Sequence, residues 1–418
     1  MNRVYLCIDL KTFYASVECI ERNLDPFQTD LIVADPSRCK GAICLAISPK
    51  MKERGIQNRC RVWEIPNHIH PIIAKPRMKK YMEYSVKIYK IYLKYIDKED
   101  IHVYSIDEAF LDVTSYLKMY HMNVEELAKM MMEDILKTTG ITATCGIGTN
   151  LYLAKIALDI TAKHVSSHIG YLNEEKYKQE LWHHTPLTDF WQIGIGTQNR
   201  LNKLHLKDMY DIANANENIL YKEFGINAKL LIDHSKGIEP CTIKDIKAYK
   251  PKSNSISNGQ ILYRDYNYKD AKKVLTEMVD AMTLELASKD LCAEVIGFYI
   301  GYSKNIIPGL KFSKKLDQPT NSYKIILKIM SQEYDYRIHH GYPIRRIHLW
   351  FGHVAKKRYE QLDLFGQYKV QEKDFKIEET VNHIKDKFGR NSILRGISFS
   401  NGATQIERNK LIGGHNAE

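Results

Sequence analysis

Three acidic residues stand where they could bind divalent cations: Asp9, Asp107 and Glu108. Asp9 ends an apolar segment (residues 4–9), where an inward-facing charge needs a partner or a metal ion. Taken alone it has an ordinary alternative, because strands often end in an aspartate that serves as a turn or helix-cap residue. Asp107 and Glu108 separate two apolar half-strands, where a plain hairpin would carry glycine or asparagine. The adjacent pair is therefore the stronger indication of function.

Three acids that meet at one end of a sheet repel one another unless cations lie among them. Their hard oxygen ligands favour Mg²⁺ or Mn²⁺, and two such ions about 3.5–4 Å apart support in-line phosphoryl or nucleotidyl transfer. One ion would lower the pKa of an attacking 3′-hydroxyl, and the other would hold a triphosphate and its departing pyrophosphate. The acids thus predict a site for two Mg²⁺ ions, with Mn²⁺ as a substitute.

The elements that must position these acids alternate between strand and helix patterns over the first 165 residues, which favours a sheet covered by helices. Strands are expected at residues 4–9, 41–47, twice within 101–114, and at 142–147; helices are expected from about 13 and at 79–96, 124–138 and 150–161. Short helices follow from about residue 170. A second block with both element types covers about 253–352, with a helix at 268–288 and strands at 294–302 and 344–351. The polar last 66 residues contain one helical pattern, at 377–388. The expected fold class is α/β (α+β).

The chain is basic, with 418 residues, a net charge of +11 and a pI near 9.0. Residues 241–352 contribute +7 of this charge, with 18 Lys and Arg against 11 Asp and Glu, and residues 241–252 have the composition of a lysine-rich linker. This distribution suits nucleic acid, although another anionic partner would also fit. No apolar run approaches the roughly 20 residues that cross a bilayer, and Asp9 and Lys11 interrupt any signal-peptide core. Eight cysteines without a CxxC pair favour reduced thiols, so we expect a cytoplasmic protein without a membrane partner.

Four segments form an ordered set of motifs: CIDLKTFYASVE (7–18), YSIDEAFLDVT (104–114), CGIGTNLYLAKIALD (145–159) and QIGIG (192–196). In these residues the sequence resembles the Y-family of DNA polymerases, and its bacterial SOS-mutagenesis or UV-damage-repair branch in particular. The resemblance covers about residues 1–400, and its first two motifs are highly specific. It implies a right-hand fold. The palm would occupy residues 1–12 and 77–170, the small fingers 13–76 and the helical thumb 171–240. A basic linker (241–252), the little finger (253–352) and the C-terminal tail (353–418) would follow.

The resemblance assigns the carboxylates of Asp9, Asp107 and Glu108 and the backbone carbonyl of Leu10 as the ligands of the metal ions. It places Phe13 and Tyr14 at the start of a helix whose amides would face the triphosphate, as anions bind at helix N-termini. Tyr14 matches the steric gate, whose ring excludes a ribose 2′-hydroxyl. Phe13 also fits an amphipathic helix start with its ring in the core, and both interpretations can hold at once.

The triphosphate contacts depart from the family pattern. Many members carry a tyrosine and, three residues on, an arginine, where this chain has Pro49 and Lys52. Lys52 is the expected replacement for this arginine, although a lysine ammonium group is a point charge and cannot form the bidentate contacts of a guanidinium group. The family's other triphosphate lysine matches Lys163 only if one extra residue precedes it. Lys155 would lie near DNA or pack its stem, and an ordinary solvated surface residue is the alternative for both Lys155 and Lys163.

Two further features would hold DNA. Gly194 and Gly196 resemble a helix–hairpin–helix turn, in which backbone N–H groups approach a phosphate without reading bases. A helix cap explains such a GxG equally well. Lys250 and Lys252 of the linker would give salt-sensitive contacts with the duplex backbone, and a solvated linker is the alternative.

The tail carries a match to the QLxLF peptide that docks onto the bacterial sliding clamp, in the residues Gln361, Leu362, Leu364 and Phe365. A short extended segment of this kind offers apolar anchors to a groove. Its alternative is a strand that packs on the little finger. Residues 387–396 resemble the tail of the same bacterial branch, without an evident mechanism.

Together these features predict a translesion DNA polymerase of the bacterial cytoplasm that acts in damage tolerance. Its expected partners are primer–template DNA, dNTPs, the sliding clamp and other SOS proteins. Two alternatives stay open. Another palm enzyme, such as a nucleotidyl cyclase, would share the sheet and its acids but would not need the thumb-like turn or the basic C-terminal block. A non-catalytic DNA-binding or clamp-binding protein would be favoured if one of the three acids were absent.

Overall fold

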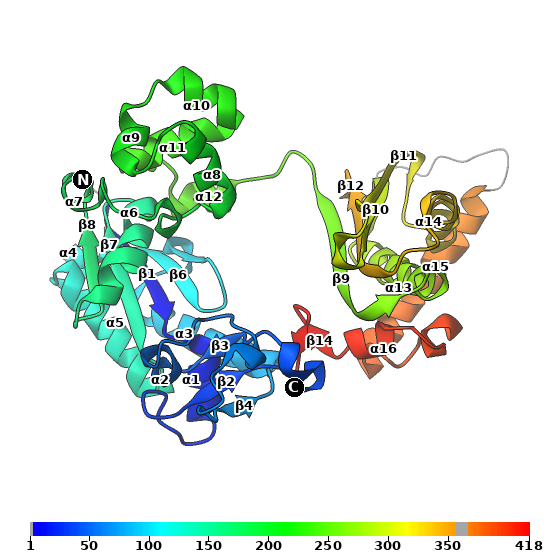
Figure 1. Ribbon diagram of the computed structural model, residues 1–418, viewed down its shortest axis with the longest axis horizontal. Helices are drawn as coiled ribbons and strands as arrows, with labels where there is room; N and C mark the ends of the chain where they lie inside the picture. Colours follow the sequence, from blue (N-terminus) through cyan, green and yellow to red (C-terminus); the bar gives the residue numbers. More distant parts are fainter. Residues whose placement is uncertain (1–2, 357–366) are drawn as a thin grey trace. The chain divides into compact units, whose positions relative to one another are not determined.

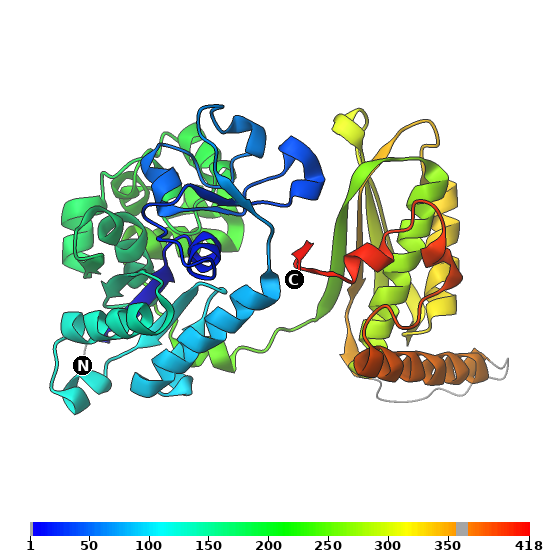
Figure 2. The same cartoon turned by 90° about the horizontal axis from the view of Figure 1, so that it is seen from below.

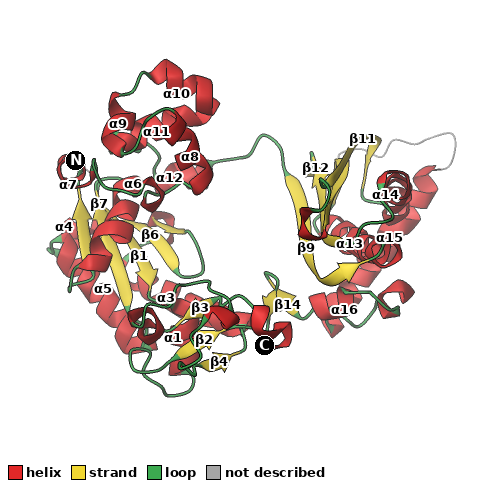
Figure 3. Cartoon of the chain, in the orientation of Figure 1, coloured by secondary structure: helices red, strands yellow, loops and turns green. Residues whose placement is uncertain are grey.

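The computed structural model describes residues 3–356 and 367–418. The chain divides into two compact units, Met1–Tyr249 with His415–Glu418, and Lys250–Gly414. Figure 1 labels their helices and strands, and Figure 3 shows that each unit combines both kinds of element. No helix of the described residues is long and apolar enough to cross a membrane.

The first unit is built on a five-stranded sheet of order β5-β6-β1-β7-β8. These strands are Ile101–Val103, Glu108–Asp112, Tyr5–Leu10, Ala143–Gly148 and Ile169–Leu172, in the same order. Strand β1 is apolar and buried from Tyr5 to Ile8, and it pairs antiparallel with β6 and with β7. Its central place brings segments a hundred residues apart in the sequence side by side. The expected strands 4–9 and 142–147 and the strand pair within 101–114 correspond to β1, β7 and the β5–β6 pair.

Helices pack onto this sheet and onto each other. Helix α3 (Met78–Tyr95) contacts α5 (Val124–Thr139), which packs on β7, and α6 (Leu151–Ile156) lies across β1 and β7. A Cβ atom on Gly146 or Gly148 would lie 2.1 Å from the backbone of Ala154, so glycine is required for this close approach of helix and strand. Helix α6 continues into a π-helical turn, Ala157–Thr161, and a 3-10 turn, Ala162–His164. Helix α4 (Tyr116–Tyr120) and a 3-10 turn, Lys98–Asp100, complete this part.

A small sheet of order β3-β2-β4 follows helix α1 (Phe13–Ile20). Its strands are Ala46–Ile47, Leu31–Val33 and Ile72–Ala74, and the short helix α2 (Pro49–Glu53) begins directly after β3. Two 3-10 turns, Pro36–Gly41 and Val62–Glu64, complete the segment. The expected strand over 41–47 is therefore reduced to two residues. A separate apolar cluster that includes Ile32, Cys44 and Met51 holds this part together.

Short helices make up residues 171–249. They are α7 (Glu174–Leu181), α8 (Ile195–Lys203), α9 (Met209–Asn214), α10 (Glu217–Phe224), α11 (Ala228–Ser235) and α12 (Ile243–Ala248), with 3-10 turns at Leu187–Asp189 and Gly225–Asn227. Helices α7 to α11 share one apolar core with α6. Helix α12 lies where the sequence suggested a linker. Thr242 and Asp245 form a capping box at its start, and the buried Ile243 packs with Tyr5 and Phe110, so apolar contact anchors half of the lysine-rich segment.

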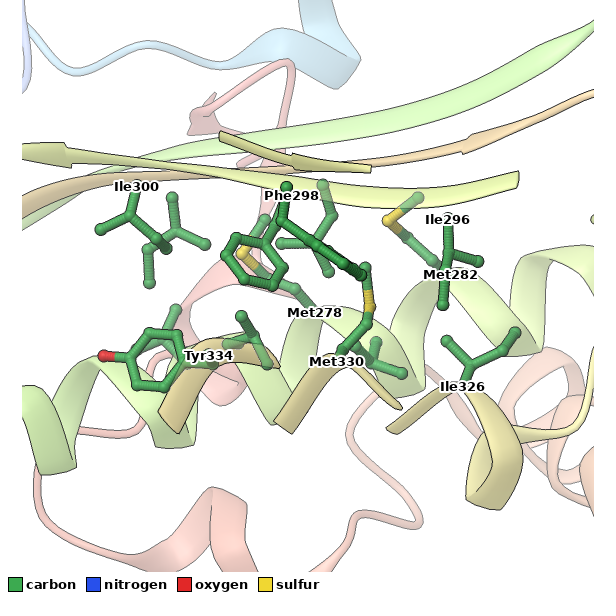
Figure 4. Packing of buried hydrophobic residues seen from close by; sticks show 14 of the residues in the cluster. Met278, Met282, Ile296, Phe298, Ile300, Ile326, Met330 and Tyr334 are labelled. Carbon is green, nitrogen blue, oxygen red and sulfur yellow. The ribbon is translucent and has the colours of Figure 1, made fainter. Parts of the chain in front are cut away.

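The second unit has an antiparallel sheet of order β11-β10-β12-β9. The strands are Leu310–Thr320, Leu291–Tyr302, Ile344–Gly352 and Ser255–Tyr266, and β13 (Ala355–Lys356) pairs with β10. Helices α13 (Tyr268–Ser288) and α14 (Tyr323–Arg337) lie on one side of this sheet (Figure 2). Between sheet and helices, Phe298 and Ile296 meet Met278, Met330 and Tyr334 in a continuous apolar core (Figure 4). Helix 268–288 was predicted with its observed bounds, whereas β9, β11 and α14 were not foreseen.

The C-terminal segment folds onto the second unit. Helix α15 (Gln367–Phe388) contacts α13 and begins ten residues before the predicted helical stretch. The 3-10 turn Gly396–Phe399, helix α16 (Gln405–Arg408) and strand β14 (Leu411–Ile412) follow. The buried Glu277 of α13 accepts the Thr404 N–H at 2.8 Å and the Gln405 N–H at 3.2 Å, which caps α16. Strand β15 (His415–Asn416) belongs to the first unit. The predicted clamp motif, residues 361–365, lies outside the described residues.

Candidate active site

The register of the first sheet brings the predicted acids together at one end. Asp9 is the residue before the end of β1, and it stands directly opposite Glu108, the first residue of β6. The Leu10 N–H donates to the Asp107 carbonyl at 3.0 Å, so Asp107 is adjacent to both. The bend between β5 and β6 is closed by the N–H groups of Tyr104 and Ser105, which both donate to the Glu108 carbonyl. Backbone pairing thus gathers three carboxylates that the sequence separates by about a hundred residues.

The three carboxylates differ in their partners. Asp107 accepts a 2.6 Å hydrogen bond from the Ser105 hydroxyl. No hydrogen bond or ion pair joins the Asp9 carboxylate to another side chain in the described part of the chain. Burial, together with the nearby charges of Asp107 and Glu108, raises the pKa of Asp9 to about 7. Asp9 is therefore an acid whose ionisation in this position needs compensation by positive charge.

Lys155 provides part of that charge. Its ammonium group lies 2.8 Å from one Glu108 oxygen and donates to the other at 2.9 Å, and it also pairs with Asp159 at 3.1 Å. The side chain is 10% exposed, and the acids around it raise its pKa against the effect of burial. Lys155 was expected to lie near DNA or to pack its stem, with a solvated surface position as the alternative. The structure contradicts only the surface position, because the lysine is buried beside the acidic bend. The i,i+4 spacing of Lys155 and Asp159 on one helix was the available signal.

The donor set suits hard divalent cations, because its side-chain donors are carboxylate oxygens. Asp9 would gain most from a cation, since burial first and then the charges of Asp107 and Glu108 raise the pKa of its carboxyl group. Within residues 3–356 and 367–418, however, no three His, Cys, Asp or Glu side chains are gathered closely enough to hold a metal ion as they stand. Both oxygens of Glu108 are bound by Lys155, and one also accepts from the Cys7 thiol at 3.1 Å. The residues fit a metal site in kind, and Glu108 would have to exchange Lys155 for the cation.

Helix α1 starts next to these acids. Its N-cap, Thr12, adopts a left-handed conformation (φ 47°) and makes no side-chain cap, so the first amides of the helix have no side-chain acceptor from it. Phe13 is buried in the core, as its alternative interpretation expected. The Tyr14 ring stacks on the buried Tyr81 with centroids 4.5 Å apart and an interplanar angle of 24°. Tyr81 in turn donates to the buried Glu18 at 2.8 Å, so the predicted gate residue rests on a hydrogen-bonded support.

The structure brings both predicted triphosphate lysines toward the acids. Lys163 interacts electrostatically with Asp9 and with Lys52, and its ammonium group lies 3.1 Å from Asp159. The π-helical turn Ala157–Thr161 precedes Lys163, and a π turn takes up one residue more than an α turn. Lys52 follows the Ser48 cap of α2, whose hydroxyl accepts the Met51 N–H at 3.3 Å.

The predicted DNA contacts lie in other parts of the chain. Gly194 caps α8 with an ordinary φ of −89°, and a Cβ on Gly194 or Gly196 would meet no atom within 4 Å. Internal packing therefore does not require these glycines, which leaves the backbone open to an outside partner. Ile195 between them is 72% exposed. Lys250 and Lys252 are exposed and follow helix α12.

The face of the second sheet opposite its helices is basic and aromatic. Tyr299 of β10 stands between Lys311 of β11 and His348 of β12, and Lys311 lies 5.7 Å from the ring centre of Trp350. A Cβ on Gly297 would lie 2.3 Å from the Trp350 ring, so this glycine lets the indole lie flat on the strand. The expected strands 294–302 and 344–351 contain all of these residues except Lys311, but their pairing across the sheet could not be read from the sequence because β11 was not foreseen.

Comparisons with known proteins match this arrangement. A family model described as impB/mucB/samB family matches residues 8–159, and the model of its C-terminal domain matches residues 253–364. A Bacillus subtilis (strain 168) protein named for UV-damage repair, UvrX, is 31% identical over 418 residues, which cover 98% of this chain and 97% of that protein. The DNA polymerase IV 2 of the same organism is 29% identical, with 99% of each chain covered. The chain belongs to the Y-family of DNA polymerases.

A solved Y-family DNA polymerase chimera, Dbh-Dpo4(243-245)-Dbh, has the same fold. It matches 85% of this chain and 100% of its own length, with a TM-score of 0.66 and 20% sequence identity. The expected α/β right-hand fold of the Y-family is therefore confirmed, including the antiparallel little-finger sheet in the second unit.

Proposed function

We propose that this Y-family chain is a template-directed DNA polymerase that adds dNTPs to a primer 3′-hydroxyl and copies damaged templates in DNA damage tolerance. The observation that carries the proposal is the pairing of Asp9 with Glu108 beside Asp107. Burial and the neighbouring acids raise the pKa of Asp9 to about 7, and carboxylates perturbed in this way are typical of functional sites.

In this proposal Asp9, Asp107, Glu108 and the Leu10 carbonyl would hold two Mg²⁺ ions. When bound, such ions supply activation of the primer hydroxyl and neutralisation of the pyrophosphate. The protein's own groups position the reactants around them. The uncapped amides at Phe13 and Tyr14 would accept the triphosphate oxygens, and Lys52 and Lys163 would pair with them. Lys155 contacts both oxygens of Glu108 and so orients this carboxylate.

The Tyr14 ring would exclude a ribose 2′-hydroxyl, because its stack on Tyr81 keeps it in place. Small fingers with few elements would check base-pair shape weakly, which suits a damaged template.

The exposed Gly194–Gly196 turn, Lys250, Lys252 and the basic sheet of the second unit would hold the duplex through its phosphates. Gln361, Leu362, Leu364 and Phe365 would dock onto the sliding clamp and raise the local concentration of the enzyme. Other SOS proteins are further partners in this proposal.

Primer extension tests the proposal. The pure protein should extend a primer with dNTPs in the presence of Mg²⁺, across an abasic site and a thymine dimer as well as on intact DNA. Asp107→Ala should abolish synthesis and leave the affinity for primer–template DNA nearly unchanged. Asp112→Asn is the matched control, since Asp112 also lies on β6 but bonds to Thr114 and Arg3. Full activity of the Asp107 variant would refute the metal assignment, and absence of synthesis with intact DNA binding would favour a non-catalytic protein.

A further inference from the structure

Residues 415–418 belong to the first unit, although residues 250–414 form the second. The proposed mechanism has not used these four residues. Within the first unit, the Asn416 side-chain amide donates to the Pro76 carbonyl at 3.1 Å. Ala417, the next residue, is buried. Residues 415–418 therefore contact the segment that joins strand β4 to helix α3.

Helix α3 has no side-chain cap of its own at this end. Its N-cap residue, Arg77, makes no such hydrogen bond, and the first N–H groups of a helix have no acceptor within the helix. The Ala417 carbonyl supplies an acceptor, because it accepts the Lys79 N–H at 3.0 Å. Glu418 forms an ion pair with the Lys79 ammonium group, and a negative charge near a helix N-terminus is favourable. Ala417 and Glu418 therefore do for α3 what an N-cap side chain does in other helices.

The first turn of α3 supports the tyrosine that matches the family's steric gate. Arg77 donates to both oxygens of the buried Glu18, at 3.0 Å and 2.9 Å, and Tyr81 donates to the same carboxylate at 2.8 Å. The loss of either contact would leave a buried charge short of a partner, so these three side chains stay together. The Tyr14 ring stacks on Tyr81. The position of Tyr14 therefore depends on the position of the first turn of α3.

We propose that residues 415–418 position the gate: they hold the first turn of α3 in place, and through Tyr81 this turn holds Tyr14. The inference rests on the proposed polymerase function and adds positioning residues to it. A ring that excludes a 2′-hydroxyl acts sterically, so it works only if its neighbours fix it to within about 0.5 Å. The acids need no such support, because the pairing of β1 with β6 holds them. Sugar selection should therefore depend on residues 415–418 more strongly than catalysis does.

Single-nucleotide insertion by the otherwise full-length protein tests this role. The measured quantity is the ratio of kcat/KM for a dNTP to kcat/KM for the matching ribonucleotide. Deletion of residues 415–418 should lower this ratio about fivefold, as expected for the loss of a helix cap, and should change kcat for the dNTP less than about twofold. Asn416→Ala removes only the hydrogen bond to Pro76 and should lower the ratio about threefold, which also gives a result if the deletion impairs folding. Lys410→Gln is the control for a change nearby in the sequence, because Lys410 forms a surface ion pair with Glu407 and should leave the ratio unchanged.

The same deletion in a Tyr14→Ala background shows whether the effect passes through the gate. Once the ring is absent, deletion of residues 415–418 should not lower the ratio further, because both changes act on one interaction. A general loss of stability would lower the activity with both nucleotides alike and would leave the ratio as it is. An unchanged ratio in the deletion variant or in Asn416→Ala, or a further fivefold loss in the Tyr14→Ala background, would overturn the proposal.

Amide hydrogen exchange separates the outcome for residues 415–418 from that for the polymerase. Without DNA or nucleotide, the deletion should speed exchange at residues 79–82 of α3 about fivefold and leave exchange in α5 unchanged. Faster exchange there, in a protein that extends no primer, would retain the capping of α3 and reject the polymerase function. Primer extension with unchanged exchange and unchanged sugar selection would retain the polymerase and reject the role of residues 415–418.

Discussion

Replacing Asp9 by asparagine should stabilise the metal-free protein, although catalysis in the proposed mechanism depends on this residue. Burial, with the charges of Asp107 and Glu108, raises the pKa of Asp9 from 3.8 to about 7. Between these two values the folded protein keeps a proton that the unfolded chain has released. The free energy of unfolding therefore falls as the pH rises from about 4 to about 7, and the full cost of the ionised carboxylate is present above pH 7.

The size of this cost follows from the shift. About three pKa units at about 1.4 kcal/mol each give a ceiling of about 4 kcal/mol. Asparagine has nearly the same volume and cannot ionise, so the substitution removes the cost without leaving a cavity. Allowing for relaxation of the acids and of Lys155, we expect Asp9→Asn to gain about 2 kcal/mol at pH 8, which corresponds to an increase of about 4–8 °C in Tm for a unit of this size.

Thermal unfolding followed by tryptophan fluorescence measures this effect, because three of the four tryptophans lie in the first unit. In EDTA the wild-type Tm should decline from pH 5 to pH 8, and that of Asp9→Asn should decline less. Mg²⁺ should raise the wild-type Tm by binding the folded state, with little effect on the variant. Asp112→Asn controls for the loss of an acid elsewhere in the sheet. A variant less stable than the wild type at pH 8, or equal stabilisation of both by Mg²⁺, would refute the reasoning.

Three further predictions follow from particular contacts. Tyr14→Ala should raise ribonucleotide incorporation relative to dNTP incorporation at least about tenfold in single-nucleotide insertion, and unchanged sugar selection would reject the gate. Lys155→Met should lower stability in EDTA by about 3 kcal/mol, because it leaves Glu108 buried without its partner, and Mg²⁺ should restore part of the loss; an unchanged Tm would contradict this. Burial raises the pKa of Glu378 to about 8, so the stability of the second unit should fall as the pH rises from about 4.5 to 8. Glu378→Gln keeps an acceptor for the Tyr323 N–H and should flatten that profile in amide hydrogen exchange of α15, whereas an equally steep profile would show that Glu378 is not the cause.

The sequence predicted helices and strands well wherever apolar residues recur along the chain at the regular spacing of a helix or form a continuous buried strand. The apolar run before Asp9 became β1, and the amphipathic patterns over 79–96, 124–138 and 268–288 became α3, α5 and α13, with ends within two residues of the prediction. The patterns failed where tertiary contacts override composition. Helix α12 has a linker-like lysine content, but the burial of Ile243 and a capping box hold it against the first sheet.

The sequence by itself determined which groups are available: the three carboxylates, the residues that begin α1, and the ordered motifs that identify the Y-family. It could not determine which charges face each other, because electrostatic interaction depends on distances across the sheet and not on separation along the chain. Only the tertiary structure placed Glu108 opposite Asp9, set Lys155 beside Glu108 and brought Lys163 close enough to Asp9 to interact with it electrostatically.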